Sequence, residues 1–374
     1  MIQSAAREFA MKEVLPVANR LDPVKGDIPM DLRDKLAQMG YFGIMIPEEY
    51  GGLGLGSFEY CLITEELARA WMSVSSIIAR TNTIPGIDKM SPAMKAVFLP
   101  RAARGEWIGA LAMSEPGTGS DLSSMSCRAK RDGESWKITG NKYWCTFADA
   151  ADYIVVVART SEAPEDKKHR GMSAFLVQKK RGEFPVGLQG ATIPKIGYFG
   201  MKTYELSFDE LRVPADAMLG EEGEGFYLFT TTMETARAHT AARSIGCARG
   251  ALEDSIAYAE QRVQFGAPIS KLQAIRFKIA TMATEIEAAR QLNYFVCTQI
   301  DAGGRCDLEA SMSKLFASEM SERVTSEGLQ IHGGAGYTTL HAVERYWRDA
   351  RLTKIFEGTS EIQQRIISDR LLGR

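Results

Sequence analysis

The spacing of apolar residues changes twice along the chain, and this change constrains the fold more than any other feature. Apolar side chains first recur at helical spacing, as at Leu32, Leu36 and Met39. Short runs of β-branched and aromatic residues then follow, such as Tyr153 to Val157, and helical spacing returns near residue 217. The pattern predicts three domains: an α-helical domain at 1–109, a β domain at 110–216 and a second α-helical domain at 217–374.

The middle block does not alternate strands with helices, which argues against a Rossmann-type cofactor site. Many short strands with polar turns predict instead an antiparallel β-barrel or sandwich. In the last block, stripes such as Ile275, Ile279, Met282 and Ile286 predict a four-helix bundle. The expected fold class is therefore a multi-domain α+β protein.

Charge and composition narrow the partners. The formal net charge of −2 provides no basic field for nucleic acid or an anionic membrane. No apolar run approaches the ~20 residues of a membrane span, and the N-terminus begins as an amphipathic helix without a signal sequence, so we expect a cytoplasmic protein. The 6 cysteines form no Cys-x-x-Cys pair and only 4 histidines occur, so reduced thiols and no metal site are expected.

One glutamate near the C-terminus is a candidate catalytic group. Gly358 is expected to end one helix, and Ser360 with Gln363 predicts a capping box that opens the next. Glu357 would then lie on a tight turn that aims its carboxylate. A solvated turn glutamate explains the local pattern more simply.

Two glycine-rich segments are candidate binding loops. In the loop from Ser114 to Asp121, glycines alternate with hydroxyl residues and would present N–H and O–H donors to a phosphate or a heterocycle. A plain connecting loop explains it equally well. The segment from Gln330 to Tyr337 follows a long helix, and its glycines are either a helix C-cap or a point of close approach to a pyrophosphate.

Taken in order, these segments resemble the acyl-CoA dehydrogenase family over essentially the whole chain. Lys142 to Thr146 is similar to the family's tryptophan–threonine flavin strand, and Arg262 to Gly266 matches a further motif. The resemblance implies an FAD-dependent dehydrogenase of fatty or aromatic acid degradation. Glu357 would remove the α-proton of an acyl-CoA, hydride would pass to flavin N5, and electrons would leave to electron-transfer flavoprotein.

The resemblance also assigns roles to other residues. The implied FAD-binding residues are Ser114, Ser120, Trp144, Thr146, Arg262, Phe265, Gln273, Gln330, Gly334, Thr359 and Glu361. Five of them, from Arg262 to Gly334, would reach the FAD of a neighbouring subunit, which implies a homo-oligomer, usually a homotetramer. The implied substrate-binding residues are Ser120, Phe226, Glu234, Arg237, Phe356 and Gly358.

The position of the base varies among family members, and some carry it on the helix near Arg237. Here Ala236 cannot act as a base, and Glu234 fits a contact to CoA better. Both observations favour Glu357.

Two departures from the family pattern concern the substrate. Phe356 stands where many relatives have tyrosine. The change either makes the wall of the acyl pocket more apolar or reflects neutral drift. Arg80 stands in a usually more apolar region, and an arginine there would bind a distal carboxylate. The alternative function is thus a dicarboxylyl-CoA dehydrogenase of glutaryl or benzylsuccinyl type, with or without decarboxylation. A surface arginine is the simpler interpretation of Arg80.

Other functions stay open on sequence grounds. An acyl-CoA oxidase would pass electrons to O₂, and a catalytically silent protein would only bind flavin or acyl-CoA. The chain also begins later in its first helix than members of the family usually do, which predicts a shortened first helix and leaves the completeness of the N-terminus open.

Overall fold

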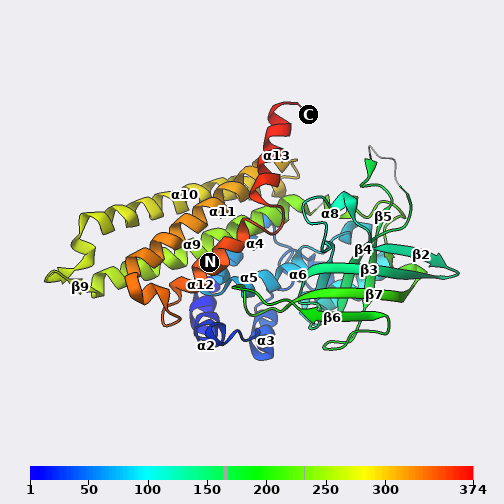
Figure 1. Ribbon diagram of the computed structural model, residues 1–374, viewed down its shortest axis with the longest axis horizontal. Helices are drawn as coiled ribbons and strands as arrows, with labels where there is room; N and C mark the ends of the chain where they lie inside the picture. The colour runs from blue at the N-terminus through cyan, green and yellow to red at the C-terminus, as the bar shows by residue number, and fades with distance from the viewer. Residues whose placement is uncertain (163–166, 231, 374) are drawn as a thin grey trace.

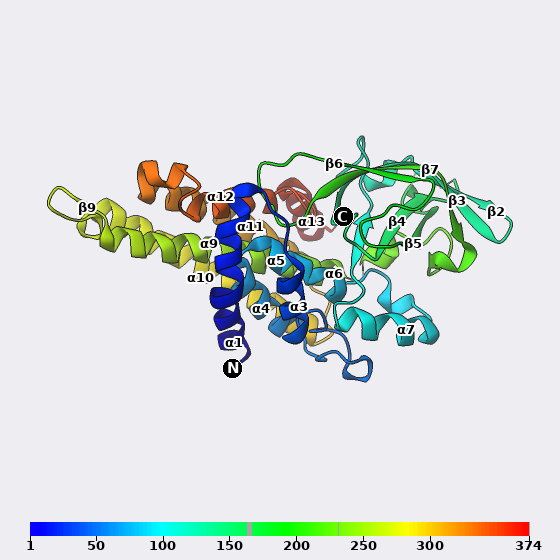
Figure 2. The same cartoon turned by 90° about the horizontal axis from the view of Figure 1, so that it is seen from below.

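A computed structural model describes residues 1–162, 167–230 and 232–373. Helices occupy both ends of the chain and a β domain the middle, as the apolar spacing predicts. The molecule is elongated, with the β domain at one end and the long helices α9, α10 and α11 reaching to the other (Figures 1 and 2). The chain therefore has the expected α+β architecture.

The N-terminal helices are built around α4, whose Tyr60, Ile63 and Leu67 are fully buried. One face of α4 packs against α9 and another against α1. Trp71 has an extended backbone, so α4 ends there and the short helices α5 and α6 lead on toward the β domain. The elements of this part are α1 (Ile2–Phe9), a π-helical stretch (Ala10–Val14), α2 (Leu15–Leu21), α3 (Met30–Gln38), α4 (Ser57–Ala70), α5 (Met72–Ile77), α6 (Ala79–Asn82) and α7 (Pro92–Ala103).

The β domain holds one eight-stranded sheet in which the strands run β6-β7-β3-β2-β4-β5-β8, with β1 paired to β4. Most pairs are antiparallel as expected, but β4 pairs in parallel with both β1 and β2. The last strand, β8, lies just beyond the expected boundary at residue 216. The strands are β1 (Gly109–Ala112), β2 (Arg128–Asp132), β3 (Ser135–Thr146), β4 (Tyr153–Arg159), β5 (Met172–Gln178), β6 (Leu188–Thr192), β7 (Thr203–Pro214) and β8 (Met218–Leu219).

Strand β3 carries an irregularity that reorients one large side chain. Its pairing with β7 shifts between Lys142 and Cys145, and Trp144 within this bulge has φ +62°. A β-bulge turns side chains away from the regular alternation of a strand. Trp144 is accordingly 57% exposed, although it lies where the long strands β3 and β7 pair.

The C-terminal helices form the bundle. Small residues such as Ala241, Ala248 and Ala251 let α9 pack closely against its neighbours α4 and α11. Helix α9 ends at Gln261, so Val263 lies in an exposed hairpin strand. The elements are α8 (Tyr227–Thr230), α9 (Met233–Gln261), β9 (Val263–Gln264), β10 (Ala267–Pro268), α10 (Gln273–Asp301), α11 (Asp307–His332), α12 (Val343–Thr353) and α13 (Ser360–Leu371).

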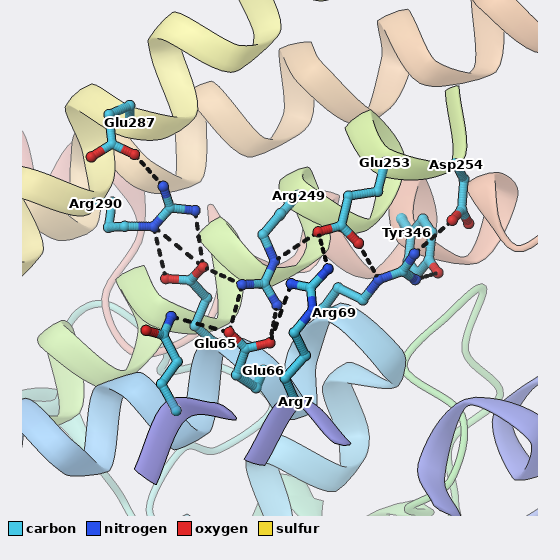
Figure 3. A network of polar contacts seen from close by, with 11 residues as sticks. Arg7, Glu65, Glu66, Arg69, Arg249, Glu253, Asp254, Glu287, Arg290 and Tyr346 are labelled. Carbon is cyan, nitrogen blue, oxygen red and sulfur yellow. Dashed lines mark hydrogen bonds and ion pairs between the residues drawn. The ribbon is translucent and has the colours of Figure 1, made fainter. Parts of the chain in front are cut away.

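A network of buried ion pairs joins the N-terminal helices to this bundle (Figure 3). Glu65 on α4 accepts from Arg249 on α9 and from Arg290 on α10, each at 3.0 Å. Beside it, Arg69 contacts Glu253 at 2.8 Å and the Tyr346 hydroxyl at 2.8 Å. Because the charges compensate one another, the network fixes α4 against three helices of the bundle.

The described residues contain neither a candidate membrane span nor a candidate metal cluster. None of the helices combines the length and the apolar character that crossing a bilayer requires. Within the same ranges, no three His, Cys, Asp or Glu side chains gather as a set of metal ligands.

Candidate active site

Glu357 lies on the turn between α12 and α13, in a backbone conformation that side chains rarely adopt. Its φ is +54°, and the following Gly358 has φ +88°. The cap of α13 is Thr359, whose side chain accepts from the N–H of Ile362 at 3.3 Å. The expected capping box at Ser360 is thus displaced by one residue, since Ser360 instead donates to Glu319 at 2.7 Å. The turn holds Glu357 in a strained geometry, as is common at functional sites.

Both carboxylate oxygens of Glu357 are bound by side chains of α9. Oε1 accepts from Nη2 of Arg243 at 2.6 Å, and Oε2 accepts from the hydroxyl of Thr240 at 2.5 Å. The Arg243 side chain is only 2% exposed, whereas that of Glu357 is 35% exposed. The carboxylate is therefore held from behind and open on its outer side.

Two opposing effects act on the pKa of Glu357. Burial raises the pKa of this carboxyl, but the charge of Arg243 and the hydrogen bonds from Thr240 and Arg243 lower it. The net result is a pKa below the usual value of a glutamate. Glu357 is therefore ionised at neutral pH, which a general base requires.

The residues on either side of Glu357 are also fixed. The Phe356 ring lies 4.5 Å from the guanidinium of Arg243 and meets Tyr198 edge-on. The carbonyl oxygen of Gly358 accepts from buried Lys314 at 2.6 Å. Phe356 and Gly358 thus support the turn, and neither position is free to move independently of Glu357.

Arg80 on α6 is half-buried, and its charge acts on groups around Glu357. Burial, together with the charges of Arg243 and Arg80, lowers the pKa of His239 on α9 to about 3. The charge of Arg80 also acts on Cys145 of β3, whose thiol pKa burial raises to about 12. Within the part of the chain that the structure describes, the guanidinium of Arg80 has no hydrogen bond or ion pair.

The loop from Ser114 to Asp121 is anchored to the bulged strand β3. The N–H of Tyr143 donates to the Ser114 carbonyl at 2.8 Å, and fully buried Lys142 donates to Glu115 at 2.9 Å. Ser114 and Trp144 are therefore close together, as the sequence hypothesis requires. Thr146, at the end of the same strand, shares a 3.0 Å hydrogen bond with Thr203. Ser120 is exposed at the far side of the loop.

Five of the proposed FAD residues lie elsewhere in the chain. They belong to the C-cap of α9, the β9–β10 hairpin, the start of α10, the end of α11 and the 3-10 turn after it, at the end of the bundle opposite the β domain (Figure 1). All are exposed, and Phe265 at the hairpin tip is 94% exposed with φ +52°. One subunit does not bring them together with Ser114 and Trp144. The five are Arg262, Phe265, Gln273, Gln330 and Gly334.

The remaining candidates lie near the ends of helices. Thr359 and exposed Glu361 are at the N-terminus of α13. Glu234, in the first turn of α9, accepts from the N–H of Cys306 at 3.2 Å. Arg237 is buried beside the N-terminus of α11 and is therefore not a helix-surface arginine. Phe226 packs against His169 before α8.

Sequence reasoning missed the groups that hold the candidate base. Thr240 and Arg243 lie on an alanine-rich, buried stretch of α9, and a polar residue among Ala238, Ala241 and Ala242 was the only available signal. Lys314 lies in an ordinary helical pattern, and nothing in the sequence around it indicated its role. No separate role was predicted for Glu115 and Lys142, which lie within two of the motifs, although their buried ion pair fixes the loop to the strand.

Comparisons with known proteins cover the whole chain. Models of the N-terminal, middle and C-terminal domains of acyl-CoA dehydrogenases match residues 1–106, 110–211 and 223–372. The chain is 42% identical to the (2S)-methylsuccinyl-CoA dehydrogenase of Cereibacter sphaeroides, over 100% of this chain and 69% of that protein.

Two solved structures share the fold closely. The first is a chain from a study of the electron transferring flavoprotein of Acidaminococcus fermentans and flavin-based electron bifurcation; its TM-score is 0.94 at 35% identity, over 100% of this chain and 97% of that chain. The second is the butyryl-CoA dehydrogenase of Megasphaera elsdenii, with a TM-score of 0.93 at 34% identity, over 99% of this chain and 97% of that chain.

Proposed function

The chain belongs to the acyl-CoA dehydrogenase family of FAD-dependent oxidoreductases, and we propose that Glu357 is the base that removes the α-proton of its acyl-CoA substrate. The observation that supports this most is the position of the Glu357 carboxylate. It is ionised, held on a strained turn by Thr240 and Arg243, and open on one side. No other carboxylate among the candidate residues combines these three properties.

FAD fits the residues around the bulge of β3. Trp144 is a large aromatic side chain kept exposed by a positive φ, and it offers a surface for an isoalloxazine ring. Nearby, the Thr118 hydroxyl oxygen is buried without a hydrogen-bond partner in the described residues. We propose that Ser114, Thr118, Trp144 and Thr146 contact the flavin. Bound FAD supplies the acceptor for the hydride that leaves the β-carbon.

The turn also offers a way to stabilise the enolate that proton removal creates. The backbone N–H of Glu357 donates no hydrogen bond within the described ranges. A preorganised N–H aimed at the thioester oxygen is worth about 3 kcal/mol of transition-state stabilisation. We propose that this N–H and Glu357's own carboxylate act on the same acyl group, the first on the oxygen and the second on the α-carbon proton.

The binding of CoA and the electron acceptor follow from the family. We propose that CoA is contacted by Phe226, Glu234 and Arg237. The nucleotide sites are completed by Ser120 and by the N-terminus of α13 at Thr359 and Glu361. A second subunit brings the exposed hairpin to the FAD. The similarity to a chain studied with electron transferring flavoprotein supports that protein as the acceptor. Peroxide formation under air at the rate of turnover would instead indicate an oxidase.

The base assignment is tested by substituting Glu357→Gln in the holoenzyme. A panel of acyl-CoAs is mixed anaerobically with the protein, and the loss of flavin absorbance is followed. We expect bleaching to slow by about 10³-fold, since general bases contribute of this order. Glu134→Gln, at the exposed β2–β3 turn, is the matched control and should bleach at the normal rate. Normal bleaching by the Glu357 variant would refute the proposal.

A carboxylated acyl group is a second candidate specificity. It is favoured by the unpaired, half-buried guanidinium of Arg80 and by the 42% identity to a methylsuccinyl-CoA dehydrogenase. Glutaryl-CoA and pentanoyl-CoA differ only in that a methyl group replaces the carboxylate. Arg80→Met should raise KM for glutaryl-CoA by about tenfold or more without a matching change for pentanoyl-CoA. Equal changes for both substrates would remove Arg80 from the site.

A further inference from the structure

The Glu357 carboxylate has a partner that substrate binding must disturb. In the free protein one oxygen is bound by Arg243 and the other by Thr240. A carboxylate that accepts from a guanidinium is a weaker base than a free one. Proton removal therefore requires that Glu357 either lose the contact with Arg243 or accept the proton while still paired with it.

Arg243 cannot follow the carboxylate when it moves. Its side chain is 2% exposed, Nη1 donates to Ser76 of α5 at 3.0 Å, and its guanidinium lies 4.5 Å from the Phe356 ring. Nε is buried and has no hydrogen-bond partner in the described residues. If Glu357 swings toward the substrate, Arg243 stays behind as a buried cation.

The charges around Glu357 do not balance. Arg80 and Arg243 both act on His239 and on Tyr60, and among the largest charge effects of the described residues on these two groups Glu357 is the carboxylate. His239 does not alter this sum, because burial lowers its pKa to about 3 and leaves it neutral. The titratable or charged groups facing Glu357 come from α4, α6, α9, α11 and the segment before β7: Tyr60, Arg80, His239, Arg243, Lys314 and Tyr198.

We propose that the substrate carries a carboxylate on its acyl group, and that this carboxylate replaces Glu357 on Arg243 and so releases the base. A plain acyl chain would leave the buried guanidinium unpaired, which is strongly unfavourable. A carboxylate restores the ion pair, and the unpaired Arg80 offers it a second contact. The inference rests on Glu357 as the proposed base and extends it by making a substrate group its trigger.

The first test uses the unaltered holoenzyme. Anaerobic flavin bleaching is measured at saturating glutaryl-CoA and pentanoyl-CoA, and with the branched pair 2-methylsuccinyl-CoA and 2-methylbutanoyl-CoA, from about pH 5 to pH 9. We expect the better carboxylated substrate to bleach on the order of a hundredfold faster than its methyl counterpart. Its rate should also begin to fall at a higher pH on acidification, because Glu357 freed from Arg243 takes up a proton more readily. Equal rates and coincident pH profiles in both pairs would overturn the inference.

The second test uses variants of the arginine. Arg243→Met should abolish the preference for the carboxylated substrate, and Arg243→Lys should retain part of it, since the charge remains. Arg323→Met, at a 52% exposed ion pair on α11, should leave the preference unchanged. If Arg243→Met loses its flavin, Arg243→Lys and the unaltered enzyme still decide the question. An inert Glu357→Gln variant together with an undiminished preference in both Arg243 variants would refute this inference and leave the proposed function standing.

Discussion

Lys314 donates a hydrogen bond of 2.6 Å from its ammonium group to the carbonyl oxygen of Gly358, the residue that follows Glu357. Lys314 is fully buried on α11, and the same carbonyl accepts from the side chain of Gln363 at 3.1 Å. The turn that carries the candidate base is therefore held by two helices besides α9. Its geometry depends on groups that touch neither the proposed substrate nor the flavin.

Replacing Lys314 by methionine should loosen this turn without removing any proposed chemical group. We expect kcat to fall by about a hundredfold, because misplacing a catalytic group by about 1 Å has an effect of that size. KM should change less than kcat, since Lys314 itself is not a proposed contact to CoA. Lys12→Met, at an exposed ion pair, is the control. Steady-state kinetics with the best acyl-CoA would check the result, and an unchanged kcat would contradict it.

The same lysine should leave a signature in the pH dependence of stability. Burial lowers the pKa of Lys314 to about 8 from the usual lysine value of 10.5. Between these values the unfolded chain binds more protons than the folded protein, so this group makes the free energy of unfolding rise with pH. Denaturant unfolding of the native protein and of Lys314→Met should therefore differ more in favour of the native protein at pH 10 than at pH 7. A pH-independent difference would contradict the lowered pKa.

Gly358 should tolerate no side chain. Its φ is +88°, and an added Cβ would lie 2.5 Å from Nε2 of Gln363. Gly303 also has a positive φ, +71°, but an added Cβ there meets nothing within 4 Å. Gly358→Ala should thus be more destabilising than Gly303→Ala, by about 1–3 kcal/mol, and should also slow flavin bleaching. Equal melting shifts for the two variants would show that backbone strain alone decides.

Local patterns in the sequence predicted the fold and a turn at Glu357. Apolar spacing distinguishes helices from strands, so the order of helical and β segments was predictable without coordinates. The expectation that Gly358 ends a helix was wrong, because α12 ends at Thr353 and Gly358 lies in the turn that follows. Arg243 was not predictable, because an arginine on a long helix is usually exposed and its partners come from α5 and the α12–α13 turn. The bulge at Trp144 was hidden for a similar reason, since it depends on the register between β3 and β7.

The buried network of Figure 3 gives the last prediction, which concerns stability and not chemistry. Glu65 is 2% exposed and accepts from both Arg249 and Arg290. Glu65→Gln keeps the shape of the side chain but leaves two arginines without their shared anion. Breaking a buried ion pair from one side typically costs 3–5 kcal/mol, so we expect a loss of about 3 kcal/mol in the free energy of unfolding.

Chemical denaturation of the flavin-loaded protein measures this loss, and Glu8→Gln is its matched control because Glu8 pairs with Lys12 at an exposed site of α1. The control should unfold at the native midpoint, since exposed ion pairs contribute little. Below its own midpoint, Glu65→Gln should bleach at the native rate, because the network contains none of the groups that hold Glu357. If Glu65→Gln were stable but bleached its flavin slowly, the packing of α4 against α9 would set the position of Arg243. The link would be α9, which carries both Arg243 and Arg249, the partner of Glu65.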